Sequence, residues 1–383
     1  MKKTNLFLNT FLGGLLKIFA FFKGQRIIKK CKIKGPAIVL GNHTSWYDFI
    51  YTLSALYPRR VTFLAAKKFF HEGSTRIFMK IARAIPKSLM QADPVATVKV
   101  FRILKKNGIV GIFPEGQISP SGRTLPLNFA IAKLIKKAKV DVYVVKHYGA
   151  GLANPPWSKL SFRGRIETSK ELIIRKEDLE TMTLQQIFDQ VTEKLYYSPS
   201  DNLEKKYKYK LKDIKNLENV LYQCPNCLYE GLEGHKHHLS CPKCNFTLTY
   251  DKYGMLNGKP VDYHFINQEN NVRKLIDDNP HYELSGTCRL WSFRNDVLVE
   301  VGQGVLTIKD FKYIYKGTVD GSLKELNFDA KNVSSLPSDI GRNVQIYEGD
   351  IIYQFELDIS WLPFKMLHMG EYLYYLSNQK TKQ

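Results

Sequence analysis

The stretch that decides the fold reads AIVLGNHTSWYD and covers residues 37–48. Its first four residues form a short apolar run typical of a buried strand, which Gly41 closes. His43 then falls at the carboxyl end of that strand, where open α/β sheets place their chemistry. Asp48 follows about one turn into the next helix, within reach of the imidazole. A carboxylate there fixes the tautomer of the histidine and leaves the other ring nitrogen as a general base.

A second stretch, IVGIFPEG over residues 109–116, repeats this layout of an apolar run followed by polar residues. If the two strands are neighbours in a sheet, their carboxyl ends bring Glu115 close to His43. A histidine and an aspartate five positions apart would otherwise indicate only a helix-capping imidazole and a solvated carboxylate. The second stretch makes us favour the catalytic interpretation.

Together these residues resemble the glycerolipid acyltransferase family, whose best-known members acylate lysophosphatidic acid. The resemblance implies a layered α/β domain in which His43 deprotonates an acceptor hydroxyl that attacks an acyl thioester. It also implies that Asp48 orients the histidine. Glu115 and Gly116, with Ser119, are expected to shape the acceptor site. The family's first block is matched at Asn42, His43, Ser45 and Asp48, and its third block at Phe113, Pro114, Glu115, Gly116 and Ser119.

The sequence departs from this family at the cations expected to bind a phosphate. Ile118 and Leu89 stand where the family usually has arginines. We therefore expect Lys87, Arg123 and Lys146 to bind the acceptor phosphate from new positions, since burying a phosphate without such partners is costly. The alternative is an acceptor whose head group is not a bare phosphomonoester.

Charge is unevenly spread along the 383 residues, whose net charge is +21. Residues 1–223 hold 40 Lys and Arg against 16 Asp and Glu, whereas residues 224–383 hold 17 against 20. A basic surface of this size favours a polyanionic partner, either nucleic acid or an anionic membrane.

The N-terminal arm, residues 1–35, helps to decide between these partners. Residues 5–22 are almost wholly apolar apart from Lys17, and lysines flank them on both sides. As a helix they would be roughly 27 Å long, which is marginal for a span. We predict a peripheral, amphipathic arm on the cytoplasmic face of the cell membrane, held to anionic lipid. A single membrane span and a buried core helix are the alternatives. No small-x-small cleavage site follows, so a signal peptide is not expected.

Four of the six cysteines form two Cys-x2-Cys pairs, Cys224 with Cys227 and Cys241 with Cys244. This spacing predicts a zinc ribbon in which four thiolates hold one structural Zn²⁺ in a closed tetrahedral site. A module of about 25 residues has too little core to fold without such a staple. Two disulfides are the alternative and would require an oxidising compartment.

The alternation of strand-like and helical patterns predicts an α/β domain, followed by the ribbon and a small β-rich domain. Strands are expected at residues 37–40, 61–65, 109–113 and 142–145, and helices at 95–106, 129–138 and 183–197. Short β-rich runs after residue 282 and a helix over 360–378 resemble a pleckstrin-homology or GRAM domain. The expected segments are an arm (1–35), an acyltransferase domain (36–200), a Lys-rich linker (201–222), a zinc ribbon (223–250) and a β-rich domain with a C-terminal helix (251–383).

The predicted function is the transfer of a fatty acyl group from an acyl thioester to the hydroxyl of a lysophospholipid, in phospholipid synthesis. Lysophosphatidic acid is the expected acceptor, and coenzyme A or acyl carrier protein is the expected carrier of the acyl group. Two other classes stay open: a zinc-ribbon nucleic-acid-binding protein and a lipid-binding scaffold without activity. The slightly acidic composition after residue 223 argues against nucleic acid. The intact His43, Asp48 and Glu115 argue against a silent scaffold.

Overall fold

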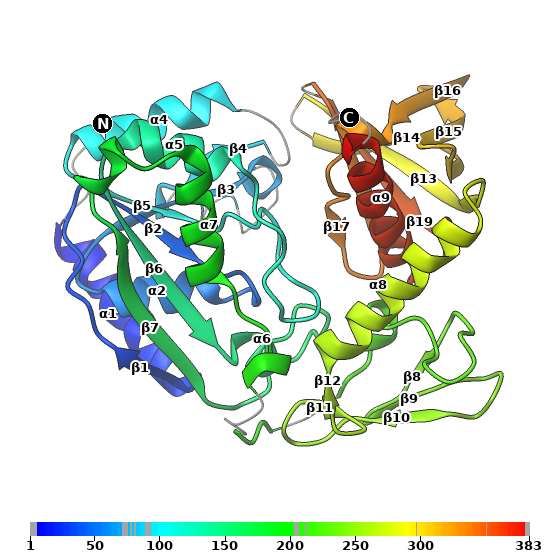
Figure 1. Cartoon of the computed structure of the whole chain (residues 1–383), viewed down its shortest axis with the longest axis horizontal. Helices are drawn as coiled ribbons and strands as arrows, with labels where there is room; N and C mark the ends of the chain where they lie inside the picture. Colours follow the sequence, from blue (N-terminus) through cyan, green and yellow to red (C-terminus); the bar gives the residue numbers. More distant parts are fainter. Residues whose placement is uncertain are drawn as a thin grey trace. The chain divides into compact units, whose positions relative to one another are not determined.

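The computed structural model of the chain describes residues 6–70, 76, 79, 82–88, 93–202, 207–210, 213–295, 297–349 and 351–379. It divides into two compact units, whose helices and strands are labelled in Figure 1. Unit 1 comprises residues 1–88, 92–212 and 251–255, and unit 2 comprises residues 89–91, 213–250 and 256–383. Leu89, one of the positions at which an arginine was expected, lies outside the described residues.

Unit 1 is built around a seven-stranded sheet with the order β1-β7-β6-β2-β5-β3-β4. The five strands β6, β2, β5, β3 and β4 are neighbours in this order and pair in parallel, whereas β7 is antiparallel to β6. The four predicted strands correspond to β2, β3, β5 and β6, while β1, β4 and β7 were not predicted. The strands are β1 (Gln25–Lys29), β2 (Ala37–Gly41), β3 (Val61–Ala66), β4 (Ile85–Lys87), β5 (Ile109–Ile112), β6 (Asp141–Tyr148) and β7 (Ile166–Ile174).

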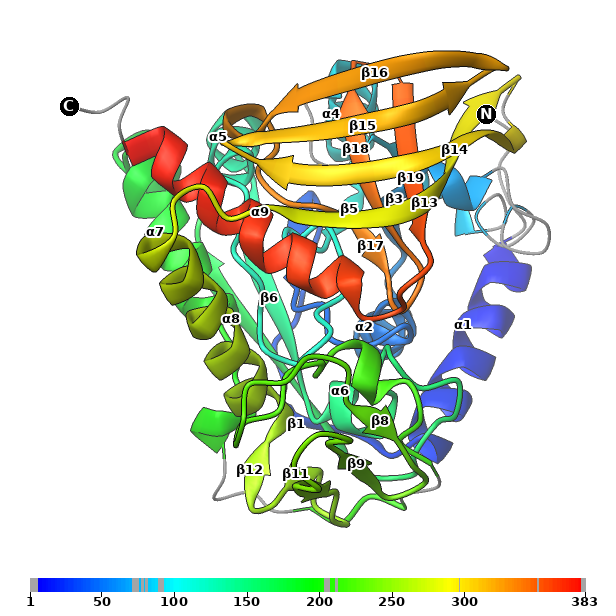
Figure 2. The same cartoon turned by 90° about the vertical axis from the view of Figure 1, so that its right-hand side faces the viewer.

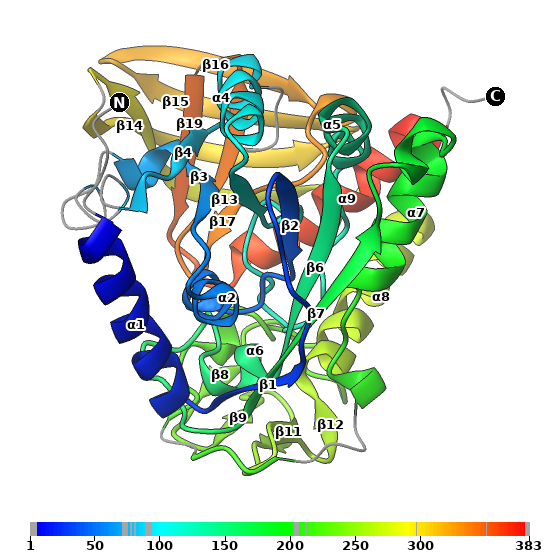
Figure 3. The same cartoon turned by 90° about the vertical axis from the view of Figure 1, so that its left-hand side faces the viewer.

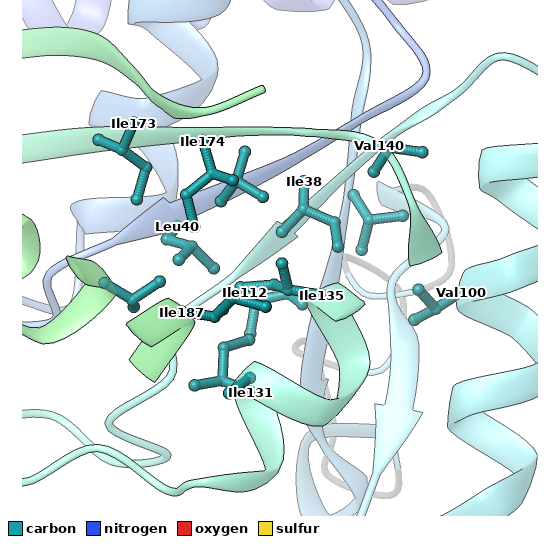
Figure 4. Packing of buried hydrophobic residues seen from close by; sticks show 14 of the residues in the cluster. Ile38, Leu40, Val100, Ile112, Ile131, Ile135, Val140, Ile173, Ile174 and Ile187 are labelled. Atoms are coloured by element: carbon teal, nitrogen blue, oxygen red, sulfur yellow. The ribbon is translucent and has the colours of Figure 1, made fainter. Parts of the chain in front are cut away.

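Helices cover both faces of this sheet, because successive residues of a strand point to opposite faces. On β2, Ile38 and Leu40 pack with residues of α4, α5 and α7, whereas Ala37 and Val39 pack with residues of α2. Figure 4 shows the first of these clusters, in which Ile38, Leu40 and Ile112 meet the helical side chains. The helices are α1 (Leu6–Phe22), α2 (Asp48–Leu56), α4 (Pro94–Lys105), α5 (Ala130–Ala138), α6 (Ala150–Ala153) and α7 (Leu184–Leu195).

Two predicted helices of unit 1, α4 and α7, begin at residues whose side chains cap the first turn. The Asp93 carboxylate accepts a hydrogen bond from the Ala96 amide at 2.9 Å, and Pro94 occupies the first helical turn of α4. Thr183 and Gln186 form a reciprocal capping box at the start of α7. These local signals explain why the positions of both helices could be predicted from sequence.

Helix α1 packs against α2, and its glycines face Tyr57, the residue that follows α2. A Cβ atom added to Gly13 would lie 3.0 Å from the Tyr57 ring, and the Lys17 ammonium lies 5.5 Å from the centre of that ring. Figure 3 shows this helix, in dark blue, outside the sheet. Within the part of the chain that the structure describes, no helix is long and apolar enough to cross a membrane.

Unit 2 contains the four-cysteine hairpin, a long helix and a second seven-stranded sheet with the order β16-β15-β14-β13-β19-β18-β17. Every pairing in that sheet is antiparallel. Figure 2 shows β13 to β16 side by side, with α9 running alongside. The elements are β8 (Glu233–Gly234), β9 (His238–Ser240), β10 (Thr247–Thr249), β11 (Met255–Leu256), β12 (Lys259–Pro260), α8 (Val261–Asp278), β13 (Leu284–Arg294), β14 (Val297–Lys309), β15 (Lys312–Val319), β16 (Ser322–Asp329), β17 (Ser338–Asp339), β18 (Asn343–Glu348), β19 (Ile351–Leu357) and α9 (Leu362–Gln379).

The cysteine hairpin and the β-rich sheet of unit 2 share helix α9. The buried Lys365 ammonium on α9 donates to Glu230 at 2.7 Å and to the Tyr282 hydroxyl at 2.8 Å. The Tyr222 ring stacks on Trp361 just before α9, with centroids 5.4 Å apart. The mixed α/β domain, the four-cysteine cluster and the β-rich region predicted from the sequence are therefore confirmed. Helix α8 and strand β13 were not predicted.

Candidate functional site

The two sequence motifs meet at one edge of the sheet of unit 1. Strands β2 and β5 pair in parallel, with Leu40 opposite Ile112, so the residues that follow them share the carboxyl edge. His43 follows β2 and Glu115 follows β5. The neighbourhood expected from the sequence is present, since the His43 amide donates to the Glu115 carboxylate at 2.6 Å.

Asp48 holds the edge of the His43 ring. His43 Nδ1 lies 3.1 Å from Asp48 Oδ2, and the same oxygen accepts the backbone amides of Thr44 at 2.6 Å and Ser45 at 2.7 Å. Asp48 is fully buried at the start of α2, where the helix dipole favours a negative charge. The His43 side chain is 18% exposed. With Nδ1 turned to the carboxylate, Nε2 is the nitrogen left for a substrate.

Aromatic rings hold the face of the same imidazole. The His43 ring stacks on Phe113 with centroids 4.3 Å apart, and Phe113 stacks on Phe63 at 5.5 Å. Two glycines leave room for this stack. A Cβ atom at Gly41 would lie 2.6 Å from the Phe113 ring, and one at Gly111 would lie 2.5 Å from the Phe63 ring. Both distances are shorter than real Cβ contacts, so the stack depends on these glycines.

The Glu115 carboxylate is hydrogen-bonded to backbone amides in this structure. The side chain is buried, and its two oxygens accept the amides of His43 at 2.6 Å and Leu125 at 2.8 Å. Burial raises the pKa of the Glu115 carboxyl well above its ordinary range, and these two hydrogen bonds partly offset that rise. The carboxylate therefore ties the loop after β2 to the loop after β5.

The residues after Glu115 continue around His43. Gly116 has φ +77°, in the region that favours glycine, and the Ser119 amide donates to the His43 carbonyl at 2.7 Å. Among the described residues, Ser119 Oγ, Thr44 Oγ1 and Asp48 Oδ1 are buried side-chain atoms that have no hydrogen-bond partner. These atoms retain hydrogen-bonding capacity beside the histidine.

The three predicted cations do not gather at one place. The Lys146 ammonium donates to the Tyr196 carbonyl at 2.7 Å, and burial lowers its pKa to about 8. The Arg123 guanidinium lies 5.9 Å from the centre of the Tyr196 ring. Lys87 instead ends β4, three strands along the sheet from β2, and donates to the Ser88 carbonyl at 2.9 Å. The structure therefore brings Arg123 and Lys146 to a common neighbour and leaves Lys87 apart.

The four cysteines of the two pairs converge in unit 2. Their sulfur atoms all lie within 4.8 Å of one another, including Cys224 to Cys244 at 3.7 Å and Cys227 to Cys241 at 3.6 Å. These two separations match the edge of about 3.8 Å expected for four sulfurs around a zinc ion at 2.3 Å. The four side chains can hold one metal ion.

Both cysteine pairs sit in the same type of turn, which supports a shared metal. The Leu228 amide donates to the Cys224 carbonyl and the Asn245 amide to the Cys241 carbonyl, each at 2.9 Å. Leu228 and Asn245 both adopt positive φ, of 60° and 58°. Each turn thus presents its two thiols from one side, as the spacing in the sequence indicated.

Sequence reasoning missed Phe63 as part of the site. Phe63 comes from β3, which a residue-by-residue search treats as ordinary core. The one available signal was the pair of glycines inside otherwise bulky strand runs, at Gly41 and Gly111, because such glycines often mark a close approach of a side chain.

Comparisons with known proteins agree with the motifs. Residues 21–147 match the family model described as "Acyltransferase". Over 142 residues the chain is 23% identical to the 1-acyl-sn-glycerol-3-phosphate acyltransferase of Bacillus subtilis (strain 168). The match covers 36% of this chain and 70% of that relative. The crystal structure of the 1-acyl-sn-glycerophosphate (LPA) acyltransferase from Thermotoga maritima aligns with a TM-score of 0.41 and 17% identity, over 52% of this chain and 80% of that one. The family model covers the part of the chain that carries both motifs, and in this part the protein resembles glycerolipid acyltransferases.

Proposed function

We propose that the protein transfers an acyl group from a thioester to the hydroxyl of a lysophospholipid, with His43 as the general base. The observation that carries this proposal is the fixed imidazole of His43. Its Nδ1 edge faces the buried Asp48 carboxylate, its face is stacked on Phe113, and its side chain remains partly exposed. A histidine that is oriented on two sides and open on the third is suited to proton transfer at Nε2.

The reaction balances without any group beyond the two substrates and these side chains. His43 Nε2 takes the proton of the acceptor hydroxyl as its oxygen attacks the thioester carbonyl. The carbon–sulfur bond then breaks, and the leaving thiolate takes the proton from the imidazolium. Asp48 stabilises the imidazolium formed in between, because Oδ2 faces Nδ1. Coenzyme A and acyl carrier protein are the two expected thiol carriers.

The proposed acceptor is lysophosphatidic acid. Its phosphate monoester would meet the Arg123 guanidinium and the Lys146 ammonium, which lie beside Tyr196. Lys146 is bonded to one carbonyl, so its remaining protons are available to an anion. Lys87 is not included with these two cations, because it ends a different strand.

A direct test incubates the purified protein with a panel of lysophospholipids and with palmitoyl-coenzyme A or palmitoyl-acyl carrier protein. Mass spectrometry then detects the diacyl products. We expect phosphatidic acid from lysophosphatidic acid with at least one donor. Absence of any diacyl product across the whole panel would contradict the proposed reaction.

Arg123→Ala tests the acceptor separately. We expect the apparent KM for lysophosphatidic acid to rise about 10- to 100-fold, as expected for loss of one charged hydrogen bond, while the KM for the acyl donor stays unchanged. Lys133→Ala is the matched control, because it removes an exposed cation from the surface of α5. Unchanged acceptor kinetics in Arg123→Ala, with equal use of a neutral lysolipid, would refute lysophosphatidic acid and leave acyl transfer standing.

We also propose that the protein works as a peripheral protein at the cytoplasmic face of the cell membrane, held through α1. With its glycines facing Tyr57, this helix exposes Phe11, Leu15, Ile18 and Phe22, which recur at helical spacing. Basic residues lie nearby, including Lys23 and Arg26. An exposed apolar stripe flanked by cations is suited to an anionic lipid surface.

Two further assignments complete the proposal. The metal of the four-cysteine cluster is Zn²⁺ in a structural role, because four thiolates leave no coordination position open for a substrate. The β-rich part of unit 2 is a pleckstrin-homology or GRAM-like domain. An antiparallel seven-stranded sheet followed by the single helix α9 supports this likeness.

A further inference from the structure

His147 occupies a position behind the site that the sequence did not single out. It is the second-last residue of β6 and is fully buried. Its backbone forms a two-way pair with the side chain of Asn42, the residue that precedes His43. Asn42 Nδ2 donates to the His147 carbonyl at 3.0 Å, and the His147 amide donates to Asn42 Oδ1 at 2.8 Å. The backbone of residue 147 therefore fixes the chain just before the general base.

The side chain of His147 reaches the other partner of His43. Its Nε2 lies 2.9 Å from the Thr52 hydroxyl, one helical turn after Asp48 on α2. On the opposite side, Nδ1 lies 3.0 Å from the Thr168 hydroxyl on β7. One imidazole thus links the first turn of α2 to two strands of the sheet.

The hydrogen bonds around this ring are compatible with a tautomer protonated at Nε2. The Thr168 hydroxyl accepts a hydrogen bond from Gln25 Nε2 at 2.9 Å and still has a proton that it can donate to His147 Nδ1. In this tautomer, Nε2 donates toward α2.

Burial keeps His147 neutral. Burial lowers its pKa to about 4, the Asp48 carboxylate opposes that fall, and His43 adds to it. The ring of Tyr51 packs edge-on, with centroids 5.8 Å apart. A neutral ring with one donor and one acceptor fits the two hydroxyl groups that flank it.

We propose that His147 is a positioning residue for acyl transfer, which holds the first turn of α2 so that Asp48 meets the Nδ1 edge of His43. This inference rests on the proposed role of His43 as general base. Its physical basis is that His147 hydrogen-bonds both Thr52 on α2, the helix that Asp48 begins, and Asn42, the residue before His43. A displacement of about 1 Å at a reacting group can cost about 10²-fold in rate.

Paired substitutions test this proposal. Gln and Asn place an amide near the positions of Nε2 and Nδ1 of histidine, respectively. His147→Gln therefore keeps the contact with α2, whereas His147→Asn keeps only the contact with Thr168. Thr52→Val removes the hydroxyl on the α2 side and Thr168→Val the hydroxyl on the β7 side, which gives a second, smaller pair of variants. Melting temperatures of all four report any general loss of stability.

We expect His147→Asn and Thr52→Val to lower kcat about 10- to 100-fold with unchanged KM for lysophosphatidic acid and palmitoyl-coenzyme A. His147→Gln and Thr168→Val should stay within about threefold of the wild type. If all four variants instead lose kcat in proportion to their melting temperatures, His147 has only a structural role and the proposal is wrong.

A second readout does not depend on turnover. Proton NMR should show a downfield resonance from His43 Nδ1–H, assigned by its loss in Asp48→Asn. We expect this resonance to be retained in His147→Gln and lost in His147→Asn. Its retention in His147→Asn would overturn the inference. A wild-type protein that acylates no lysolipid would refute the proposed function alone, because the resonance still reports on His147.

Discussion

At the scale of single residues, the imidazole of His43 is held from three directions. Asp48 fixes its edge, the Phe113 ring fixes its face, and Glu115 fixes its backbone amide. Each contact restrains a different motion of the ring, so the direction of Nε2 is set before a substrate arrives. In the proposed acyl transfer, preorganisation of this kind would lower the barrier because the reacting atoms need no further ordering.

Some of these roles could be predicted from the sequence and others could not. His43 and Asp48 lie five residues apart, so a local helical turn already brings them together. The role of Lys87 depended on which strand neighbours which, and β4 is placed away from β2 by two intervening strands. His147 was hidden for the same reason, because its partners come from α2 and β7, far away in the sequence.

Glu371 in unit 2 gives a residue-scale prediction about pH. Burial raises the pKa of its carboxyl from the ordinary 4.5 to about 7, although a hydrogen bond from Ser335 opposes the shift. The ionised form is therefore less favourable in the folded than in the unfolded chain, and stability is lost as pH rises from about 4.5 to about 7. Glu371→Gln should raise the stability of unit 2 at pH 8 by at most about 3 kcal/mol and leave it unchanged at pH 4. Thermal melts at both pH values measure this, and equal effects at both would contradict it.

At the scale of elements, helix α8 shows why a helix can be missed when secondary structure is predicted from the sequence. Its buried positions Val261, Phe265, Val272 and Ile276 follow a helical period, but the position between them is Gln268. That glutamine is buried because its amide donates to the Val220 carbonyl at 2.6 Å and accepts the Tyr222 amide at 3.2 Å. A polar residue with a tertiary hydrogen-bonding role interrupts the apolar pattern from which helices are predicted.

Helix α1 shows the opposite case, in which the sequence predicted both the helix and its amphipathic character. The sequence contains one face of small residues and one of large apolar residues. The small face packs on Tyr57, because glycine allows the ring to approach closely. This leaves the large apolar residues outside, where a soluble surface helix would carry polar ones.

Membrane binding through α1 can be tested at this scale. We expect Leu15→Ser with Ile18→Ser to weaken binding to anionic vesicles about 100-fold, because each lost apolar contact is worth at least about 1.4 kcal/mol. Leu323→Ser is the matched control, because this leucine is 86% exposed in unit 2. Vesicle flotation at low and high salt measures the effect. Equal binding by the α1 variant and the control would rule out α1 as the attachment site.

At the scale of the whole molecule, the chain combines a basic, motif-bearing part before residue 224 with a slightly acidic part that holds the cysteines. The excess of Lys and Arg lies before residue 224, together with the acyltransferase motifs. This distribution associates the positive charge with the proposed lipid chemistry and not with the four-cysteine cluster.

We therefore expect the metal site to stabilise unit 2 and to have no effect on acyl transfer. We expect one zinc per chain by elemental analysis. Cys241→Ser should lower the melting temperature of unit 2, because the cysteine hairpin packs on α9 through Glu230 and Lys365. Turnover by unit 1 should persist. Two disulfides in place of a metal, or loss of turnover with unit 1 still folded, would contradict this account.

The central claim, that His43 is the general base of an acyl transfer, is tested most directly by the turnover of His43→Ala. A positioned general base contributes about 10² to 10⁴ in rate, so kcat should fall by that factor while the melting temperature is unchanged. Asp48→Asn should lose less, because it disturbs the orientation of the base and leaves the base in place. A folded His43→Ala protein that forms diacyl product at the wild-type rate would contradict the claim.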